Sequence, residues 1–333
     1  MNRRTFIASV TGNILAAPFV ASVDAQESRP PSARKIPLVG ILHPGVPDVN
    51  VPAIIALRQG LQDLGYVEGQ NIALEYRWAG GKLETLPGLA AEFVRLNVDV
   101  FYALGPQAIR AAFDASRTIA ILGADLEGDP VENGFAASFA RPGGNLTGLF
   151  LDLPGLTGKW FELIREVVPA TRRIAVLWDT TTGSYQLRAL KVTVQAAAMD
   201  LQVLEVRRPA EYESVLRTAM RGHPQALIQL SSPLLLQASR RVAEFAIANR
   251  LPAISMFKEF AEAGGLMTYG PDLLAFFGRA ADLVDKMLKG AKAGGLPLEQ
   301  PTKFGLVINL KTAKALGLAI PQSILLRADQ VIE

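Results

Sequence analysis

The chain has 333 residues, half of them apolar and a fifth charged, and its 34 Lys and Arg residues nearly balance its 31 Asp and Glu residues. This composition excludes intrinsic disorder, favours two domains and argues against nucleic-acid binding, which needs a block of basic residues. Cysteine is absent and histidine occurs twice, so disulfides, thiolate chemistry and multi-histidine metal centres are excluded, and we expect neither a metal nor a cofactor.

The first 25 residues are typical of an export signal. Arg3 and Arg4 precede an apolar run over residues 6–23, and Ala25 ends a cleavage-like site of small residues. The run is short and interrupted by polar residues and a proline, so we prefer a removed signal over a membrane anchor. We expect cleavage near Ala25 and a periplasmic product, exported by either the twin-arginine or the general route.

Short apolar runs then alternate with amphipathic runs of helical period. The predicted strands in the first half are 38–42, 71–77, 98–103 and 119–123, with helices at 51–64, 83–96 and 106–116. Strands that alternate with helices of 10–15 residues indicate parallel βαβ units. Since the strands other than 71–77 are apolar without alternation, we expect a doubly wound sheet that is covered on both faces.

Residues 140–148 contain one proline and three glycines without helical period, and we interpret them as part of a crossing between domains. A second series of the same kind follows. Its predicted strands are 173–178, 201–206, 226–230, 252–256, 264–270 and 303–309, and its predicted helices are 155–168, 184–199, 211–221, 234–249, 273–289 and 311–316. The sequence therefore predicts an α/β protein with two similar lobes.

Familiar catalytic motifs are absent. The chain has no phosphate-binding P-loop, no dinucleotide fingerprint, no HExxH and no GxSxG. His43 follows the first strand, and Asp125, Glu127 and Asp129 follow the strand at 119–123, where ligands of open α/β sheets bind. If the protein were an exported enzyme, His43 with Asp125 would be the candidate catalytic pair; the alternative for each of these residues is a role in loop hydrogen bonding.

Several long segments are distinctive as continuous strings: residues 58–72 (RQGLQDLGYVEGQNI), 75–79 (EYRWA), 128–131 (GDPV), 140–148 (ARPGGNLTG), 263–271 (AGGLMTYGP) and 300–314. Together they resemble the substrate-binding protein family of ABC transporters that is predicted to take up amino acids, of which tryptophan-binding proteins are a branch. The resemblance covers essentially the whole chain after the signal.

This resemblance implies a type I periplasmic-binding-protein fold, with two doubly wound parallel-sheet lobes joined by three hinge crossings and a ligand between them. We assign residues 36–143 and 270–298 to lobe 1, and 144–269 and 299–333 to lobe 2. The implied function is a receptor, not an enzyme, that closes on a small molecule, such as an amino acid, and delivers it to a membrane permease with its ATPase. A monomer is the default expectation, and an exported sensory module is the alternative receptor.

The loops at 103–107, 123–127 and 179–184 depart from the family's usual sequences, so the resemblance leaves the ligand open. We therefore choose candidate ligand residues from strand ends and side-chain chemistry: His43, Gly105, Gln107, Asp125, Asp129, Trp178, Asp179, Thr180, Tyr185, Ser231, Ser232 and Phe257. Hydroxyl groups of Thr180, Ser231 and Ser232 suit a carboxylate. Asp125 or Asp129 suits an ammonium group. Trp178 or Tyr185 suits a planar side chain, with a core position as the equal alternative for Trp178.

Overall fold

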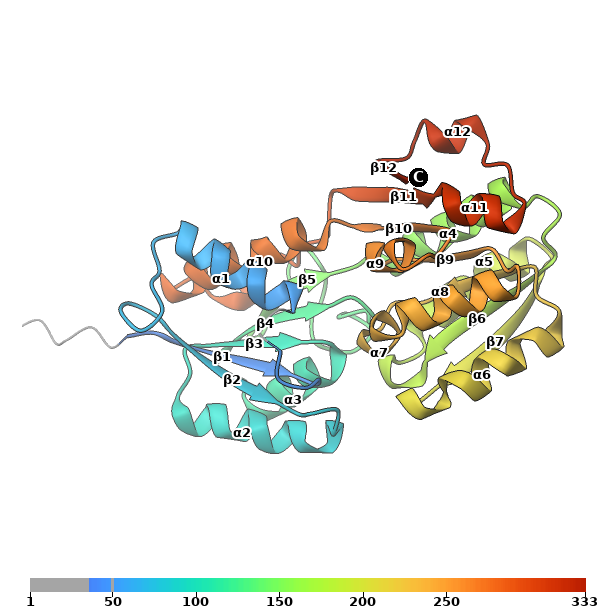
Figure 1. Cartoon of the computed structure of the whole chain (residues 1–333). Coiled ribbons are helices and arrows are strands. Elements are labelled where there is room, and N and C mark those ends of the chain that lie inside the picture. The colour runs from blue at the N-terminus through green and yellow to red at the C-terminus, as the bar shows by residue number, and fades with distance from the viewer. Residues whose placement is uncertain (1–35, 49–50) are drawn as a thin grey trace, which may run out of the picture. The chain divides into compact units, whose positions relative to one another are not determined.

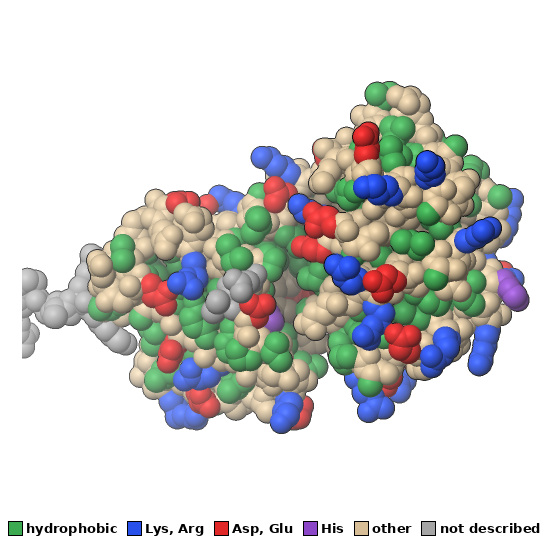
Figure 2. Space-filling view, in the orientation of Figure 1, with side chains coloured by type: hydrophobic (Ala, Val, Ile, Leu, Met, Phe, Trp, Pro, Cys, Tyr) green, Lys and Arg blue, Asp and Glu red, His purple; other side chains and the backbone are tan. Residues whose placement is uncertain are grey.

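The computed structural model describes residues 36–48 and 51–333, so the predicted signal and its cleavage site lie outside the described residues. Two mainly parallel sheets organise the described chain, each with helices on both faces (Figure 1). Figure 2 shows Lys and Arg interspersed with Asp and Glu over the visible face, which therefore carries no extended patch of one charge.

The first sheet has the strand order β2-β1-β3-β4-β5, all parallel. Its strands are β1 (Leu38–His43), β2 (Ala73–Trp78), β3 (Val100–Leu104), β4 (Ala120–Asp125) and β5 (Leu146–Phe150). Its helices are α1 (Pro52–Asp63), α2 (Leu86–Leu96), α3 (Pro106–Ala115) and α10 (Leu273–Leu288). We call this sheet with these helices the first lobe. In Figure 1, α1 and α10 lie side by side on one face, and α2 and α3 on the other.

The second sheet has the order β12-β11-β10-β9-β8-β6-β7, in which only β10 and β11 pair antiparallel. Its strands are β6 (Arg173–Asp179), β7 (Asp200–Val206), β8 (Ala226–Gln229), β9 (Ala253–Ser255), β10 (Met267–Pro271), β11 (Phe304–Asn309) and β12 (Gln330–Ile332). Its helices are α4 (Leu153–Val167), α5 (Tyr185–Ala196), α6 (Tyr212–Ala219), α7 (Pro233–Gln237), α8 (Ser239–Ala248), α9 (Lys258–Glu262), α11 (Leu310–Leu316) and α12 (Gln322–Leu325). This sheet with these helices is the second lobe.

The first crossing between the lobes differs from the sequence prediction. Residues 146–150 form β5, which pairs with β4, so the chain leaves the first lobe after Phe150 and not at residue 143. Gly148, which the sequence analysis placed in the crossing, is required by strand packing. A Cβ at this position would lie 2.0 Å from the carbonyl oxygen of Gly123 on β4. Only glycine lets the two strands approach so closely.

Two further crossings return the chain. After β10, α10 packs against α1 in the first lobe, and after residue 295 the chain goes back to β11. At this last crossing Glu299 donates its backbone N–H to Gly148 O at 2.8 Å and accepts one from Phe150 N at 2.9 Å, so two of the crossings lie against each other. The first lobe is thus made of discontinuous chain.

Other predicted elements differ locally. The helix expected over 234–249 is two helices, because the ladder is interrupted at Ala238, whose N–H bonds Leu235 O three residues back. The helix α12 and the strand β12, which extends the sheet beyond β11, lie beyond the last element that the sequence predicted.

The close contact of α1 with α10 leads to a test of the discontinuous lobe. A Cβ at Gly60 of α1 would lie 2.6 Å from the Cβ of Ala281 on α10, whereas one at Gly88 of α2 would meet no atom within 4 Å. We expect Gly60→Ala to lower the free energy of unfolding by about 1–3 kcal/mol through overpacking. The matched variant Gly88→Ala should raise it by about 0.5–1 kcal/mol through helix propensity. Urea unfolding measures both, and equal effects of the two variants would contradict the packing.

Candidate functional site

Both sheets reverse their strand order at the same place. Chain order runs from β1 to β2 on one side and to β3 on the other in the first lobe, and from β6 to β7 and β8 in the second. The carboxyl ends of strands at such a switch point leave a crevice in which ligands of α/β proteins bind. His43 and Gly105 lie at this point in the first lobe, and Asp179 and Ser231 in the second.

A cavity of about 120 Å³ lies at these strand ends and takes residues from both lobes. Its walls are almost entirely apolar. The first lobe contributes His43, Pro44, Val51, Pro52, Ala53, Leu104, Gly105, Ala124, Leu126, Glu127, Leu273 and Phe277, and the second contributes Pro233, Leu236 and Phe257. Among these described residues, His43 and Glu127 have the ionisable side chains. We call this space the cleft cavity.

His43 is held as a neutral ring. Its Nδ1 accepts a hydrogen bond from Gly45 N at 2.8 Å, which leaves Nε2 to carry the proton and to act as a donor. The ring packs on Trp78 with 4.9 Å between ring centroids. Burial lowers the pKa of His43 to about 4, although the charge of Asp48 acts in the opposite direction. At neutral pH the cleft cavity therefore contains an imidazole N–H and no imidazolium charge.

Asp125 and Glu127 form a buried acid pair directly after β4. Asp125 Oδ1 accepts hydrogen bonds from Glu127 N at 2.8 Å and Gly128 N at 3.1 Å. Burial raises the pKa of Asp125 to about 6, despite these bonds. Burial, together with the charge of Asp125, raises the pKa of Glu127 well above its usual range. Two adjacent carboxyl groups in an apolar setting do not both ionise, so the pair retains a proton.

The acid pair is bonded to the second lobe through one hydroxyl group. Ser231 Oγ donates to Glu127 Oε1 at 2.8 Å. Ser231 is itself fixed by Gln186 of α5, which accepts from Ser231 N and donates to Ser231 O, each at 2.8 Å. All three side chains are buried. This contact therefore joins the ends of β4 and β8 across the two lobes.

Asp179 and Ser232 organise the loops of the second lobe. Ser232 Oγ donates to Asp179 Oδ2 at 2.7 Å and caps α7 by accepting from Leu235 N. Asp179 Oδ1 accepts from the N–H and the hydroxyl of Thr181. Because their polar atoms are used within the lobe, these two residues position the loops after β6 and β8.

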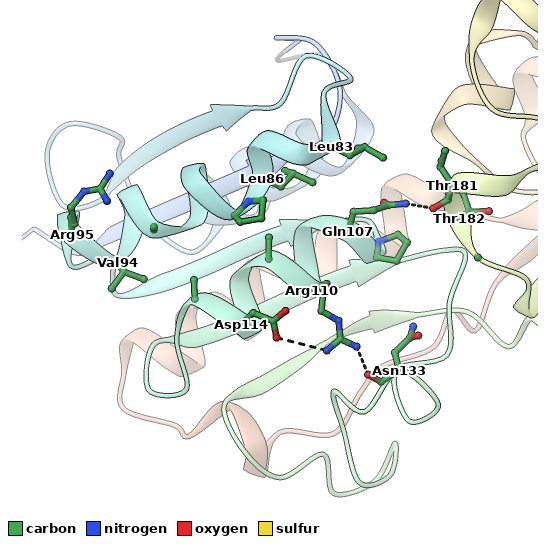
Figure 3. Close-up of a pocket in the computed structure, with 16 residues that line it drawn as sticks. Leu83, Leu86, Val94, Arg95, Gln107, Arg110, Asp114, Asn133, Thr181 and Thr182 are labelled. Carbon is green, nitrogen blue, oxygen red and sulfur yellow. Dashed lines mark hydrogen bonds and ion pairs between the residues drawn. The ribbon is translucent and has the colours of Figure 1, made fainter.

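Further polar contacts between the lobes lie outside the cleft cavity. Tyr185 of α5 hydrogen-bonds the Asp129 carboxylate, and Arg188 pairs with Glu132. Gln107, at the start of α3, donates to the carbonyl oxygen of Thr181 (Figure 3). The loop after β4 thus contacts the second lobe at three acidic residues.

A larger open groove of about 830 Å³ runs between α2 and α3 and ends at residues 181–183 of the second lobe (Figure 3). Arg110 on its rim bonds the carbonyl oxygen of Asn133 and lies near Asp114. We call this space the outer groove; it is lined mainly by α2, α3 and the turn after β6.

The structure separates the candidate residues into groups. His43, Gly105 and Phe257 line the cleft cavity, and Asp125 and Ser231 contact Glu127 there. Gln107 lines the outer groove. Asp129, Asp179, Tyr185 and Ser232 make the contacts described above. The Trp178 indole N–H donates to Gly183 O at 2.8 Å, and Thr180 begins the short turn after β6.

The sequence-based selection missed Glu127, together with Leu273 and Phe277 of α10. The signal for Glu127 was present, since it lies between the two selected aspartates. The candidate catalytic pair is not assembled, because His43 bonds Gly45 while Asp125 bonds the amides of Glu127 and Gly128.

Within residues 36–48 and 51–333, no helix combines the length and apolar character needed to cross a membrane. In the same part of the chain, no three His, Cys, Asp or Glu side chains are grouped so that they could hold a metal ion.

Comparisons with known proteins identify a family. The family model described as ABC transporter substrate binding protein matches residues 43–332. A curated relative, the tyrosine-binding protein of Clostridioides difficile (strain R20291), is 25% identical over 278 residues, which are 81% of this chain and 79% of the relative.

Solved structures share the fold, which is of the type I periplasmic-binding-protein class. A conserved domain protein from Vibrio cholerae O1 biovar eltor str. N16961 superposes with a TM-score of 0.82 at 25% identity, over 89% of this chain and 100% of the other. The ABC domain in complex with L-Trp from Streptococcus pneumonia superposes with a TM-score of 0.79 at 21% identity, over 89% of this chain and 99% of the other.

The neutral state of His43 leads to a pH prediction. A histidine whose pKa is lower in the folded than in the unfolded state contributes stability that is lost as pH falls through the interval between the two values. From about pH 7 to about pH 4.5 we expect the wild type to lose more stability than His43→Asn. Asparagine keeps an acceptor for Gly45 N but does not titrate.

Melting temperatures across this pH range measure the difference between the two proteins. The control is His223→Asn, which removes an exposed imidazole from a turn with φ 47°, a conformation that asparagine tolerates. Parallel pH profiles for the wild type and His43→Asn would show that the ring is not buried in its neutral form.

Proposed function

The chain belongs to the ABC transporter substrate binding protein family, and we propose that it is an exported receptor that closes its two lobes on an amino acid with an apolar or aromatic side chain. The observation that carries the proposal is the cleft cavity at the switch points of both sheets, apolar except for His43 and Glu127. The 25% identical relative that is named a tyrosine-binding protein supports this ligand class. We propose that the receptor acts as a periplasmic monomer and delivers its ligand to a membrane permease with its ATPase.

The chemistry of the cleft cavity suits the parts of such a ligand. The Nε2–H of His43 is a donor for a carboxylate. Phe257, Leu273 and Phe277 offer apolar and aromatic surface to a side chain. Glu127 is an acceptor for an amino group. A ligand that contacts both walls favours the closed arrangement by its differential affinity for that state.

Closure would use the contacts between the lobes and the three crossings. The Ser231–Glu127 bond can form only when the end of β4 approaches that of β8, and the Tyr185–Asp129 bond only when the loop after β4 approaches the start of α5. The crossings between β5 and α4, between β10 and α10, and between η5 (Ala293–Gly295) and β11 are the segments that connect the lobes. They are short, so the motion they permit is a hinge rotation.

The first test is a thermal-shift screen of the chain from Gln26 onward against the L-amino acids and their deaminated analogues. A ligand that binds only the folded chain, at about one hundred times its Kd, adds about 2.7 kcal/mol to the free energy of unfolding. We expect aromatic or branched amino acids to raise the melting temperature. If no amino acid raises it, an amino-acid receptor is ruled out.

Neighbouring leucines on α10 provide a matched pair of variants. Leu273 lines the cleft cavity, whereas Leu274 is 57% exposed to solvent. We expect Leu273→Ala to weaken the best amino-acid ligand roughly tenfold, because apolar contact worth about 1.4 kcal/mol is lost. Leu274→Ala should bind like the wild type in calorimetric titrations. Equal affinity of Leu273→Ala and the wild type would place the ligand elsewhere.

A further inference from the structure

One oxygen of the acid pair has no hydrogen-bond donor among the described residues. Asp125 Oδ1 accepts from two backbone amides, and Glu127 Oε1 accepts from Ser231. Asp125 Oδ2 is buried and has no hydrogen-bond partner among the described residues. A buried carboxylate oxygen without a donor is costly, and in a receptor this cost is removed when a ligand brings the donor.

The walls of the cleft cavity bring no compensating positive charge. No Lys or Arg is among its described lining residues, and His43 is neutral. Fully ionised, Asp125 and Glu127 would place two negative charges beside apolar side chains, at a large desolvation cost. A proton shared by the pair lowers that cost while the cleft cavity holds no cation, which agrees with the raised pKa values of both groups.

We propose that the ligand's cationic amino group replaces the proton shared by Asp125 and Glu127, so that binding expels one proton to solvent. The inference rests on the proposed amino-acid receptor function and adds its proton stoichiometry. Before binding, the pair is one carboxylic acid and one carboxylate. After binding, both are carboxylates beside an –NH3+ group, no covalent bond has changed, and the proton has passed to the buffer.

The neighbouring ionisable groups are already engaged. His43 stays neutral above about pH 5, given its lowered pKa of about 4. Asp129 is bonded by Tyr185 and by the amides of Val131 and Glu132, and Asp179 by Ser232 and Thr181. These bonds exist without a ligand, which leaves the acid pair as the source of the expelled proton.

Calorimetric titration in buffers of different ionisation enthalpy measures the proton count. With L-tyrosine or L-tryptophan as the probe at about pH 6, we expect the wild-type chain from Gln26 onward to release roughly one proton. Because the proton competes with the amino group, binding should weaken by up to about tenfold for each pH unit below the pair's pKa. A deaminated analogue of the same probe leaves the proton in place, so its binding should release none.

Variants and a spectroscopic readout identify the groups. Glu127→Gln should reduce the proton release and the preference for the amino acid over its deaminated analogue. Glu84→Gln, at an exposed acid of the first lobe that makes none of the contacts between the lobes described above, should keep the wild-type proton count. In infrared difference spectra of the wild type, the probe should remove a carboxylic-acid C=O band, and this loss should be absent in Glu127→Gln.

The outcomes separate the two proposals. Amino-acid binding without proton release, or without loss of the acid band, would overturn the exchange while leaving the receptor function intact. If the screen finds no amino-acid ligand, the receptor function fails and the exchange fails with it. Proton release that persists in Glu127→Gln together with unchanged discrimination would also overturn the assignment to this pair.

Discussion

A carboxyl group can be buried between apolar surfaces only when it keeps its proton or faces a positive charge, and Glu127 lies under this constraint. Glu127 follows β4, contacts Asp125 and accepts one hydrogen bond from a hydroxyl group of the other lobe. The local structure accommodates the constraint: Asp125 fixes the turn through two amides, and Gln186 holds Ser231 in place to donate. The contact between the lobes is therefore polar, but no positive charge of the cleft cavity's walls balances the acid pair. A cationic group of a ligand can supply that charge.

The topology of the two sheets places Glu127 near strand ends of both lobes. In the first lobe β1 lies between β2 and β3, and in the second lobe β6 lies between β7 and β8. This strand order opens a crevice at the ends of β1 and β3 and at those of β6 and β8. The return of α10 to the first lobe adds Leu273 and Phe277 to the same crevice. A helix that is distant in the sequence from β1 and β3 thus completes the cleft cavity. The crossings before and after this helix are among the segments about which the lobes can move.

Much of this could be predicted from the sequence because it follows from period and strand ends. Alternating apolar runs predict the α/β class, and the end of the first strand selects His43, which does line the cleft cavity. Glycine patterns were less informative, since Gly148 marks a close approach of two strands and not a turn. Trp178 could not be placed, because whether an indole N–H bonds its own loop, as it does at Gly183, depends on the turn after β6. Chain position alone could not separate Glu127 from Asp129 in the same loop. Glu127 is buried and lines the cleft cavity, whereas Asp129 bonds Tyr185 outside it, and burial is a tertiary property.

The positions of donors and acceptors in the cleft cavity define a direction for the proposed ligand. The neutral imidazole of His43 offers a single N–H, and an imidazolium would instead offer a positive charge that the acid pair would attract. The lowered pKa of His43 therefore keeps two different binding groups in the site. The imidazole N–H suits the carboxylate of a ligand, and Asp125 with Glu127 suits its cationic group. If the pKa of His43 were higher, the ring would be an imidazolium whose positive charge balances the acid pair. A cationic group of the ligand would then not be needed. Burial of the ring against Trp78 is thus part of the same recognition as burial of the acids.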